Sequence, residues 1–356
     1  MERIVHLIFT LESGGSENML VDIANEQASL AEITIILINK KFSIDIVSRI
    51  NENVHFYSLE RKEHDRTSIS FLFRLWGLLL KIRPTVIHCH NHNIILLLPL
   101  GRKRTVLTIH DLGASTRHLR KYRKVYSISS AVSENIRART GIPSPVVLNG
   151  IKFSDIFSKT DYRFDAHTPV RIVQVSRMIH ERKGQHVLLK ALYKLTADKD
   201  CPPIHLDLIG TGASLPYLLS LTDILKLDGH VSFLGERSRE WIYEHLCSYD
   251  ILVQPSLTEP FGLTVLEGIA AGLPVVASDN AGPAEILSGL PGGYLFTPGN
   301  DTELAGTIRK VISTMQEGKM QQRCKLSQEI AIDRYSVHRT AFEYLHQYSR
   351  LRQTTQ

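Results

Sequence analysis

The chain has 356 residues, which is too long for one ordinary hydrophobic core and favours two domains. It is 43% apolar and 22% charged, which is typical of a folded globular protein and excludes a disordered or fibrous one. Its longest uninterrupted apolar run, residues 94–100, is far shorter than the roughly 20 residues that span a bilayer.

The net charge of +6 is concentrated in the first half of the chain. Residues 1–155 contain 21 Lys and Arg against 14 Asp and Glu, whereas residues 156–356 contain 21 against 22. This asymmetry predicts an acidic partner or surface for the first half, although a small basic excess without such a role is equally common. The four cysteines form no CxxC pair, which is typical of free thiols in a reducing cytoplasm.

The N-terminal segment predicts a phosphate-binding arrangement. Residues 3–9 are an apolar strand, and no signal-peptide cleavage region follows them. The next residues include Gly14 and Gly15, which permit a tight turn, and Ser16 is the expected cap of the helix that follows. A strand, a glycine turn and a helix can bind an anion, but many α/β proteins begin in this way.

Further strands are expected at residues 33–38 and 54–58, followed by an amphipathic helix at residues 70–81. The apolar side of this helix is predicted to pack into the core, and a membrane-surface role is the alternative. Later in this half, residues 117–124 carry six basic side chains, and residues 146–149 are expected to form its last strand.

Histidines follow two strands of this half. His88, His90 and His92 alternate, so they would share one face of a strand, but no carboxylate or fourth ligand accompanies them and we predict no metal site. His110 follows a strand at residues 105–109. Ligands bind at the carboxyl ends of parallel strands, so we predict that His110 belongs to a site.

The second half begins after a segment without a clear period, residues 156–169, which we interpret as a linker. A strand at residues 171–175 leads into a basic loop and then a helix. Arg177 and Lys183 lie in this loop, where paired cations suit a pyrophosphate, and Arg182 could take the place of Lys183.

The most informative stretch is TEPFGLTVLEGIAAG, residues 258–272. Glu259 precedes a predicted helix, Gly262 marks the helix start, and Glu267 lies inside it. The two carboxylates therefore bracket a helix N-terminus, which favours an anion such as a diphosphate. Ionised carboxylates only accept hydrogen bonds, so they suit hydroxyl groups, and a sugar nucleotide combines both chemistries.

This stretch resembles the E-x7-E signature of retaining glycosyltransferases of the GT-B fold, in particular glycosyltransferase family 4. The opening GG-x-E, the H-x-H and T-x-H-D segments and Asn149-Gly150-Ile151 are similar to the same family, although Lys152 stands where the family has Asp. The resemblance covers nearly the whole chain. It implies an α/β protein with two facing Rossmann-like domains, each with a doubly wound parallel sheet.

The domains expected are residues 1–155 on the acceptor side and residues 170–334 on the donor side, with a C-terminal helix in 335–356 that packs back on the first domain. In the donor-binding set that the resemblance implies, Glu259 contacts the sugar, Glu267 contacts the ribose, and Arg177 and Lys183 grip the diphosphate. The set is completed by Gly14, Gly15, Phe261, Gly262 and Leu263. His110 lies beside the sugar at the interdomain cleft and joins Glu259, Arg177 and Lys183 as the catalytic residues.

The predicted function is transfer of a sugar, with retention, from a UDP- or GDP-sugar to a hydroxyl of a glycan or lipid-linked acceptor, in cell-surface polysaccharide or lipopolysaccharide synthesis. No metal or other cofactor is expected, because cations and a helix start stand where carboxylates would hold Mg²⁺ or Mn²⁺. The expected location is the cytoplasm, including the inner membrane surface. The alternatives are a sugar-nucleotide epimerase and a non-enzymatic binder of an anionic surface or nucleic acid. A nucleic-acid partner is not expected, because no standard binding motif is present.

Overall fold

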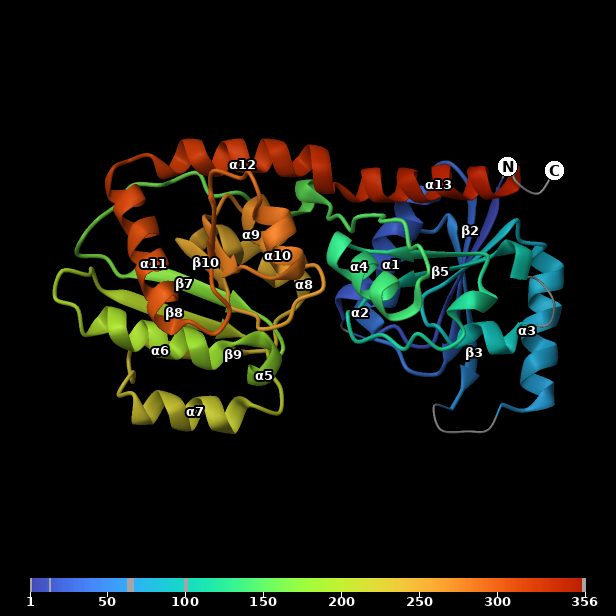
Figure 1. The fold of residues 1–356 in the computed structure, drawn as a ribbon, viewed down its shortest axis with the longest axis horizontal. Helices are drawn as coiled ribbons and strands as arrows, with labels where there is room; N and C mark the ends of the chain where they lie inside the picture. Colours follow the sequence, from blue (N-terminus) through green and yellow to red (C-terminus); the bar gives the residue numbers. More distant parts are fainter. Residues whose placement is uncertain (1, 13, 63–66, 99–101, 354–356) are drawn as a thin grey trace. The chain divides into compact units, whose positions relative to one another are not determined.

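The computed structural model describes residues 2–12, 14–62, 67–98 and 102–353. The chain divides into two compact units (Figure 1). Unit 1 comprises Met1–Ile151 and Tyr335–Gln356, and unit 2 comprises Lys152–Arg334. Each unit is built around one parallel sheet. No described helix combines the length and the apolar character that a membrane crossing requires.

Unit 1 contains a six-stranded sheet with helices packed around it (Figure 1). Its strands are β1 (Arg3–Ile8), β2 (Glu32–Asn39), β3 (Val54–Arg61), β4 (Val86–Cys89), β5 (Thr105–Ile109) and β6 (Lys124–Ser127). Its α-helices are α1 (Gly15–Gln27), α2 (Ile44–Ser48), α3 (Ile69–Ile82), α4 (Ser130–Thr140) and α13 (Val337–Gln353). Its 3-10 turns are η1 (Ile94–Leu97), η2 (Arg102–Arg104) and η3 (Leu119–Lys121).

The strand order in unit 1 is β3-β2-β1-β4-β5-β6, and all neighbours are parallel. This is the doubly wound order of a Rossmann-like domain, in which the order reverses between β1 and β4. Seven of the eight residues of β2 are buried, which explains its continuous apolar sequence, because helices cover both faces of such a sheet. Helix α13 packs against α1, so the C-terminus belongs to unit 1 (Figure 1).

The structure corrects two local predictions in unit 1. Helix α1 begins at Gly15 and its N-cap is Gly14, two residues before the expected cap Ser16. The expected strand at residues 146–149 is reduced to a single bridge between Val146 and Ser127. The Ser127 amide donates to the Pro145 carbonyl and the Val147 amide donates to the Ser127 carbonyl, whereas the Leu148 carbonyl accepts from Thr340 Oγ1 of α13 instead of from a strand.

Unit 2 has the same architecture. Its strands are β7 (Val170–Val175), β8 (Ile204–Ile209), β9 (Val231–Gly235), β10 (Ile251–Gln254), β11 (Val275–Ser278) and β12 (Gly293–Phe296). Its α-helices are α5 (His180–Lys183), α6 (Gln185–Thr196), α7 (Leu215–Ile224), α8 (Arg239–His245), α9 (Leu263–Ala270), α10 (Ala281–Leu287), α11 (Asp301–Gln316) and α12 (Met320–Tyr335). Its 3-10 turns are η4 (Phe153–Asp155) and η5 (Leu246–Ser248).

The sheet of unit 2 has the order β12-β11-β10-β7-β8-β9, again with all neighbours parallel. The order reverses between β7 and β10, so the ligand position of a doubly wound sheet lies beyond the carboxyl ends of these two strands. Helix α6 packs against α7 and α11, and its apolar face belongs to the core of this unit (Figure 1). The two parallel α/β sheets confirm the predicted fold class.

The segment at residues 156–169 lies within unit 2 and is bonded to it. Lys159 Nζ donates to the Tyr249 carbonyl at 2.8 Å and pairs with Asp250 at 3.0 Å. Tyr162 Oη donates to the Gly272 carbonyl at 2.6 Å. These contacts hold the segment against the start of β10 and the end of α9, so it is part of the unit rather than a free connection.

Candidate functional site

The loops that follow β7 and β10 meet beyond the carboxyl edge of the unit 2 sheet. Gly184, which ends α5 and caps α6, has a φ of +68°. A Cβ at this position would lie 1.9 Å from the Pro255 carbonyl oxygen, so only glycine allows the two loops to approach this closely. The Leu257 amide donates to the Arg182 carbonyl at 2.8 Å and joins the loops a second time.

Three buried glutamines donate hydrogen bonds to these loops. Gln174 Nε2 donates to the Lys183 carbonyl at 3.0 Å, and Gln185 Nε2 donates to the Arg177 carbonyl at 2.9 Å. Gln254 Nε2 donates to Ser256 Oγ at 3.0 Å. Gln174 and Gln185 therefore hold the backbone of the loop that carries Arg177 and Lys183, and Gln254 holds a side chain of the loop after β10.

Lys183 and Glu259 come together in this site. Lys183 Nζ lies 2.5 Å from Glu259 Oε2, and the two side chains are only 24% and 12% exposed. Ser256 Oγ donates to the same carboxylate oxygen at 3.5 Å. Arg182, the alternative to Lys183, is exposed, so Lys183 is the cation of this loop that faces Glu259.

The other predicted polar residues of unit 2 occupy different surroundings. Glu267 is half-buried on α9, and Tyr243 Oη donates to its Oε1 at 3.5 Å; Arg239 Nε donates to that hydroxyl at 2.6 Å. The Arg177 side chain is exposed and makes no hydrogen bond or ion pair with the residues that the structure describes. Because the Lys183 ammonium is paired with Glu259, the exposed Arg177 guanidinium supplies the positive charge that an anionic ligand would meet in this loop.

The segment before α9 is in close contact with a second glycine, Gly282. Gly262 caps α9 with a φ of +105°. The Gly282 amide donates to the Glu259 carbonyl at 3.2 Å, and a Cβ on Gly282 would lie 2.1 Å from the Phe261 carbonyl oxygen. The Phe261 side chain is 3% exposed and packs into the core, while Leu263 is half-buried. Of the predicted donor-binding residues here, Phe261 therefore presents no side-chain surface to a ligand.

In unit 1, the predicted glycine turn opens α1. Gly14 N donates to the Glu12 carbonyl at 2.8 Å, and the Gly14 carbonyl accepts from Asn18. Gly15 is the first helical residue, and Ser13 lies outside the described residues. The first amides of α1 follow this turn, at the place where the sequence predicts an anion-binding arrangement.

His110 belongs to a group of histidines that the sequence did not reveal as a group. His90 Nδ1 lies 3.1 Å from His110 Nε2, and His90 Nε2 lies 3.1 Å from His6 Nδ1. Burial lowers the pKa of His110 to about 4 and that of His6 to about 4. His6 was not predicted, and the only signal for it is a polar residue in the middle of the apolar strand β1.

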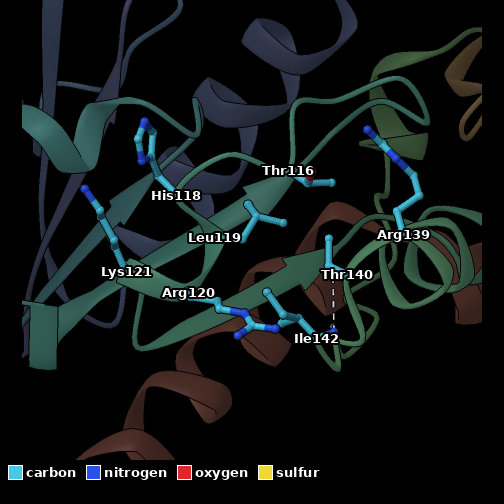
Figure 2. A pocket seen from close by; sticks show the side chains of 8 residues that line it. All are labelled: Thr116, His118, Leu119, Arg120, Lys121, Arg139, Thr140 and Ile142. Carbon is cyan, nitrogen blue, oxygen red and sulfur yellow. Dashed lines mark hydrogen bonds between the residues drawn. The ribbon is translucent and has the colours of Figure 1, made fainter.

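A basic hollow of about 430 Å³ lies elsewhere in unit 1 (Figure 2). It is lined by Thr116, His118, Leu119, Arg120, Lys121, Arg139, Thr140 and Ile142. Arg120 and Arg139 are both exposed, and Arg139 Nη1 donates to the Ala114 carbonyl at 2.9 Å. This hollow contains part of the basic segment 117–124 and is separate from the histidine group.

Comparison with known proteins agrees with this architecture. The profile of the glycosyl transferases group 1 matches residues 161–328, and that of Glycosyltransferase Family 4 matches residues 13–154. The chain belongs to glycosyltransferase family 4. This confirms the predicted family. The match to residues 161–328 lies within unit 2, and the match to residues 13–154 lies in unit 1 except for its last residues, 152–154.

Individual proteins are similar in sequence to parts of this family 4 member. The chain is 33% identical over 108 residues to sucrose-phosphate synthase of Zea mays and 32% identical over 142 residues to an uncharacterized glycosyltransferase of Methanocaldococcus jannaschii. These matches cover 29% and 40% of this chain but 10% and 35% of the relatives, so it spans a minor part of their length. Anabaena HepE, solved with UDP and glucose, is 22% identical with a TM-score of 0.78, over 98% of this chain and 100% of that one. The likeness to HepE shows the shared GT-B fold.

Proposed function

We propose that the chain transfers a sugar from a nucleotide-diphosphate sugar to an acceptor hydroxyl, with retention of the anomeric configuration. The observation that carries this proposal is the pair of Lys183 and Glu259 at 2.5 Å, at the switch point of unit 2 and next to the start of α9. A cation, a carboxylate and free helix amides are what a diphosphate joined to a hydroxyl-rich ring requires.

The chemistry assigned to these residues is stabilisation of charge on the leaving diphosphate. Lys183 and Arg177 would neutralise the charge that develops when the glycosidic bond breaks, and such electrostatic stabilisation is often the largest catalytic contribution. Glu259 would accept hydrogen bonds from the sugar, Glu267 from the ribose, and His110 would contact the sugar. Gly14 and Gly15 would approach the diphosphate. No metal is required, because the cations take its place.

The test is hydrolysis of UDP-, GDP- and ADP-sugars without an acceptor, with UDP-glucose first because HepE was solved with UDP and glucose. One donor is expected to be cleaved slowly, in the presence of EDTA, to the sugar with unchanged anomeric configuration by NMR. Glu267→Gln should lower the rate, while Glu329→Gln, at an exposed position of α12, should not. Release of an altered sugar nucleotide, or activity that depends on Mn²⁺, would contradict the proposal.

We also propose that unit 1 works at the inner face of the cytoplasmic membrane, on a lipid-linked acceptor. On α3, Phe71, Leu75 and Leu79 are buried, as predicted, but Ile69, Phe73 and Leu80 are 73%, 64% and 75% exposed. Apolar side chains at this spacing follow a second stripe of the helix. Exposed apolar groups on a basic unit suit an anionic lipid surface, where each cation contributes about 1 kcal/mol.

Sedimentation with vesicles tests this second proposal. Binding is expected with phosphatidylglycerol, should weaken as salt screens the charges, and should be absent with phosphatidylcholine alone. Ile69→Ser should reduce vesicle binding. Ile224→Ser on α7 is the matched control, because Ile224 is equally exposed at 72% but lies in unit 2, and it should leave binding unchanged. Binding should also fall when four basic residues of unit 1 are replaced by Gln together: Arg117, Arg120, Lys121 and Arg123. Binding should persist when four lysines of unit 2 are replaced by Gln together: Lys190, Lys199, Lys226 and Lys310. Protein that stays in the supernatant at low salt would refute the membrane role.

A further inference from the structure

A continuous row of hydrogen bonds links four side chains inside unit 1. Gln27 Oε1, at the end of α1, lies 2.9 Å from His6 Nε2 on β1. His6 Nδ1 lies 3.1 Å from His90 Nε2, and His90 Nδ1 lies 3.1 Å from His110 Nε2. The row therefore runs from Gln27 through His6 and His90 to His110.

The direction of this row is set at its Gln27 end. The amide nitrogen of Gln27 donates to the Ala341 carbonyl of α13 at 3.5 Å, and a carbonyl can only accept. The amide oxygen of Gln27 must then face His6, and an amide oxygen can also only accept. His6 must therefore carry its proton on Nε2.

The position of the proton on His6 determines which nitrogen is protonated in His90 and in His110. Burial lowers the pKa of His6 and His110 to about 4 and holds that of His90 well below its usual value. At neutral pH each ring is neutral, with one donor and one acceptor nitrogen. His6 Nδ1 therefore accepts from His90 Nε2, and His90 Nδ1 accepts from His110 Nε2. His110 Nδ1 is left without a proton.

His110 Nδ1 is also the one ring nitrogen of the row that has no partner among the described residues. It is buried, whereas both nitrogens of His6 and of His90 are engaged. A buried acceptor without a donor is costly and is found where a ligand supplies the missing hydrogen bond.

The same region offers a three-histidine group for a metal, formed by His6, His88 and His90. The nitrogens of His88 are already bonded, Nε2 to Thr108 Oγ1 at 2.7 Å and Nδ1 to Tyr348 Oη at 2.6 Å. All six ring nitrogens of this group thus have hydrogen-bond partners within the fold. A metal would have to break several of these bonds, so the geometry favours a hydrogen-bonded row.

We propose that Gln27, acting through His6 and His90, fixes the tautomer of His110 so that its Nδ1 accepts a hydrogen bond from a ligand hydroxyl. Gln27, His6 and His90 are positioning residues in this scheme, and only His110 touches the ligand. The tautomer is inferred from the orientation of the Gln27 amide and the neutral state of the rings, and it does not depend on what the ligand is. The identity of the ligand as a sugar rests on the proposed function.

Two-bond proton–nitrogen NMR on the full chain, with ring-labelled histidine, tests the tautomer. Signals are assigned by comparison with His110→Gln. In the wild type, His110 is expected to show a protonated Nε2 and an unprotonated Nδ1 at neutral pH. Gln27→Leu removes the acceptor that sets the direction, so the Nδ1-protonated form should appear. Thr108→Val, which removes a bond of His88 outside the row, should leave the His110 pattern unchanged.

The wild-type spectrum decides the question even if Gln27→Leu does not fold. A His110 that carries its proton on Nδ1 would overturn the proposal. So would Zn²⁺ bound at one per chain with loss of the His6 and His90 ring-proton signals. These readouts need no donor or acceptor, so failure of the glycosyl transfer assay leaves them intact, and their failure leaves the transfer assay intact.

Discussion

At the scale of single residues, the contact between Lys183 and Glu259 changes what a substitution is expected to do. The sequence predicts only that Lys183 serves ligand binding, and it gives no indication of a role in stability. In the structure, its ammonium neutralises a carboxylate that is only 12% exposed. Removing the lysine therefore leaves a poorly solvated charge without a partner, so activity and stability are coupled at this position.

We expect Lys183→Met to lower donor hydrolysis by about 10²–10³-fold, the usual loss when one group that stabilises a developing anion is removed. It should also reduce the free energy of unfolding by about 1–3 kcal/mol. Adding Glu259→Gln should recover stability but not activity. Denaturant titration and steady-state hydrolysis measure both.

The control for this prediction is Lys194→Met in the same unit. Lys194 pairs with Asp301 at 2.7 Å, but the two side chains are 40% and 25% exposed. A surface pair of this kind contributes no more than about 1 kcal/mol, and Lys194 is not part of the site. Wild-type hydrolysis by Lys183→Met would remove Lys183 from the donor site.

At the scale of elements, glycines decide how closely the site loops approach. Gly184 and Gly235 have nearly the same backbone conformation, with φ of +68° and +69°. A Cβ on Gly184 would lie 1.9 Å from a backbone oxygen, whereas a Cβ on Gly235 would meet open space. The two positions therefore separate the cost of a left-handed backbone from the cost of a steric clash.

Gly235→Ala should cost about 1 kcal/mol, which is the strain of a left-handed alanine. Gly184→Ala should cost about 2–3 kcal/mol more, because a carbonyl oxygen of the Pro255 loop must move. It should also impair donor hydrolysis, since Lys183 precedes Gly184 directly. Thermal unfolding and hydrolysis assays check both variants, and equal stability losses would show that the loops separate without cost.

The sequence interpretation misses one helix of unit 2 and one apolar stripe of unit 1. Helix α7 (Leu215–Ile224) was not predicted, because its apolar residues do not follow one face and Tyr217, Leu219 and Ile224 are exposed. On α3, the buried stripe was predicted correctly, but the exposed stripe was not. Periodicity identifies residues that can be buried, and it does not show whether a second apolar face has a neighbour in the fold.

At the scale of the whole molecule, the buried histidines make the stability of unit 1 depend on pH. Burial lowers the pKa of His6 and of His110 from 6.5 to about 4, and holds the pKa values of His88 and His90 well below 6.5. Between pH 6.5 and pH 4, the unfolded chain binds protons that the folded unit excludes. The stability of unit 1 is therefore fully present above about pH 6.5 and is lost as the pH falls toward 4.

We expect unit 1 to lose about 2 kcal/mol for each of His6 and His110 between pH 7 and pH 5. Hydrogen exchange with mass spectrometry, corrected for intrinsic rates, resolves the two units, which need not unfold together. Protection should fall in β1, β4 and β5 more than in β7 and β10. Equal changes in both sheets would mean that these histidines do not control acid stability.

The fold class and the family can be predicted from the amino-acid sequence. Alternating apolar strands and amphipathic helices require parallel sheets covered on both faces, and Gly262, Glu259 and Glu267 fall at fixed offsets within one local stretch. Such features depend on near neighbours in the chain, so a sequence contains them. The roles of the site residues in donor binding stay predictions.

The contacts between side chains that are far apart in the chain become known only from the three-dimensional structure. Lys183 and Glu259 are 76 residues apart, His6 and His90 are 84 apart, and Gln27 bonds to a carbonyl 314 residues away. These contacts follow from the strand order and from the return of α13 to unit 1. No local period encodes that order, because it results from packing all the strands and helices around two common cores.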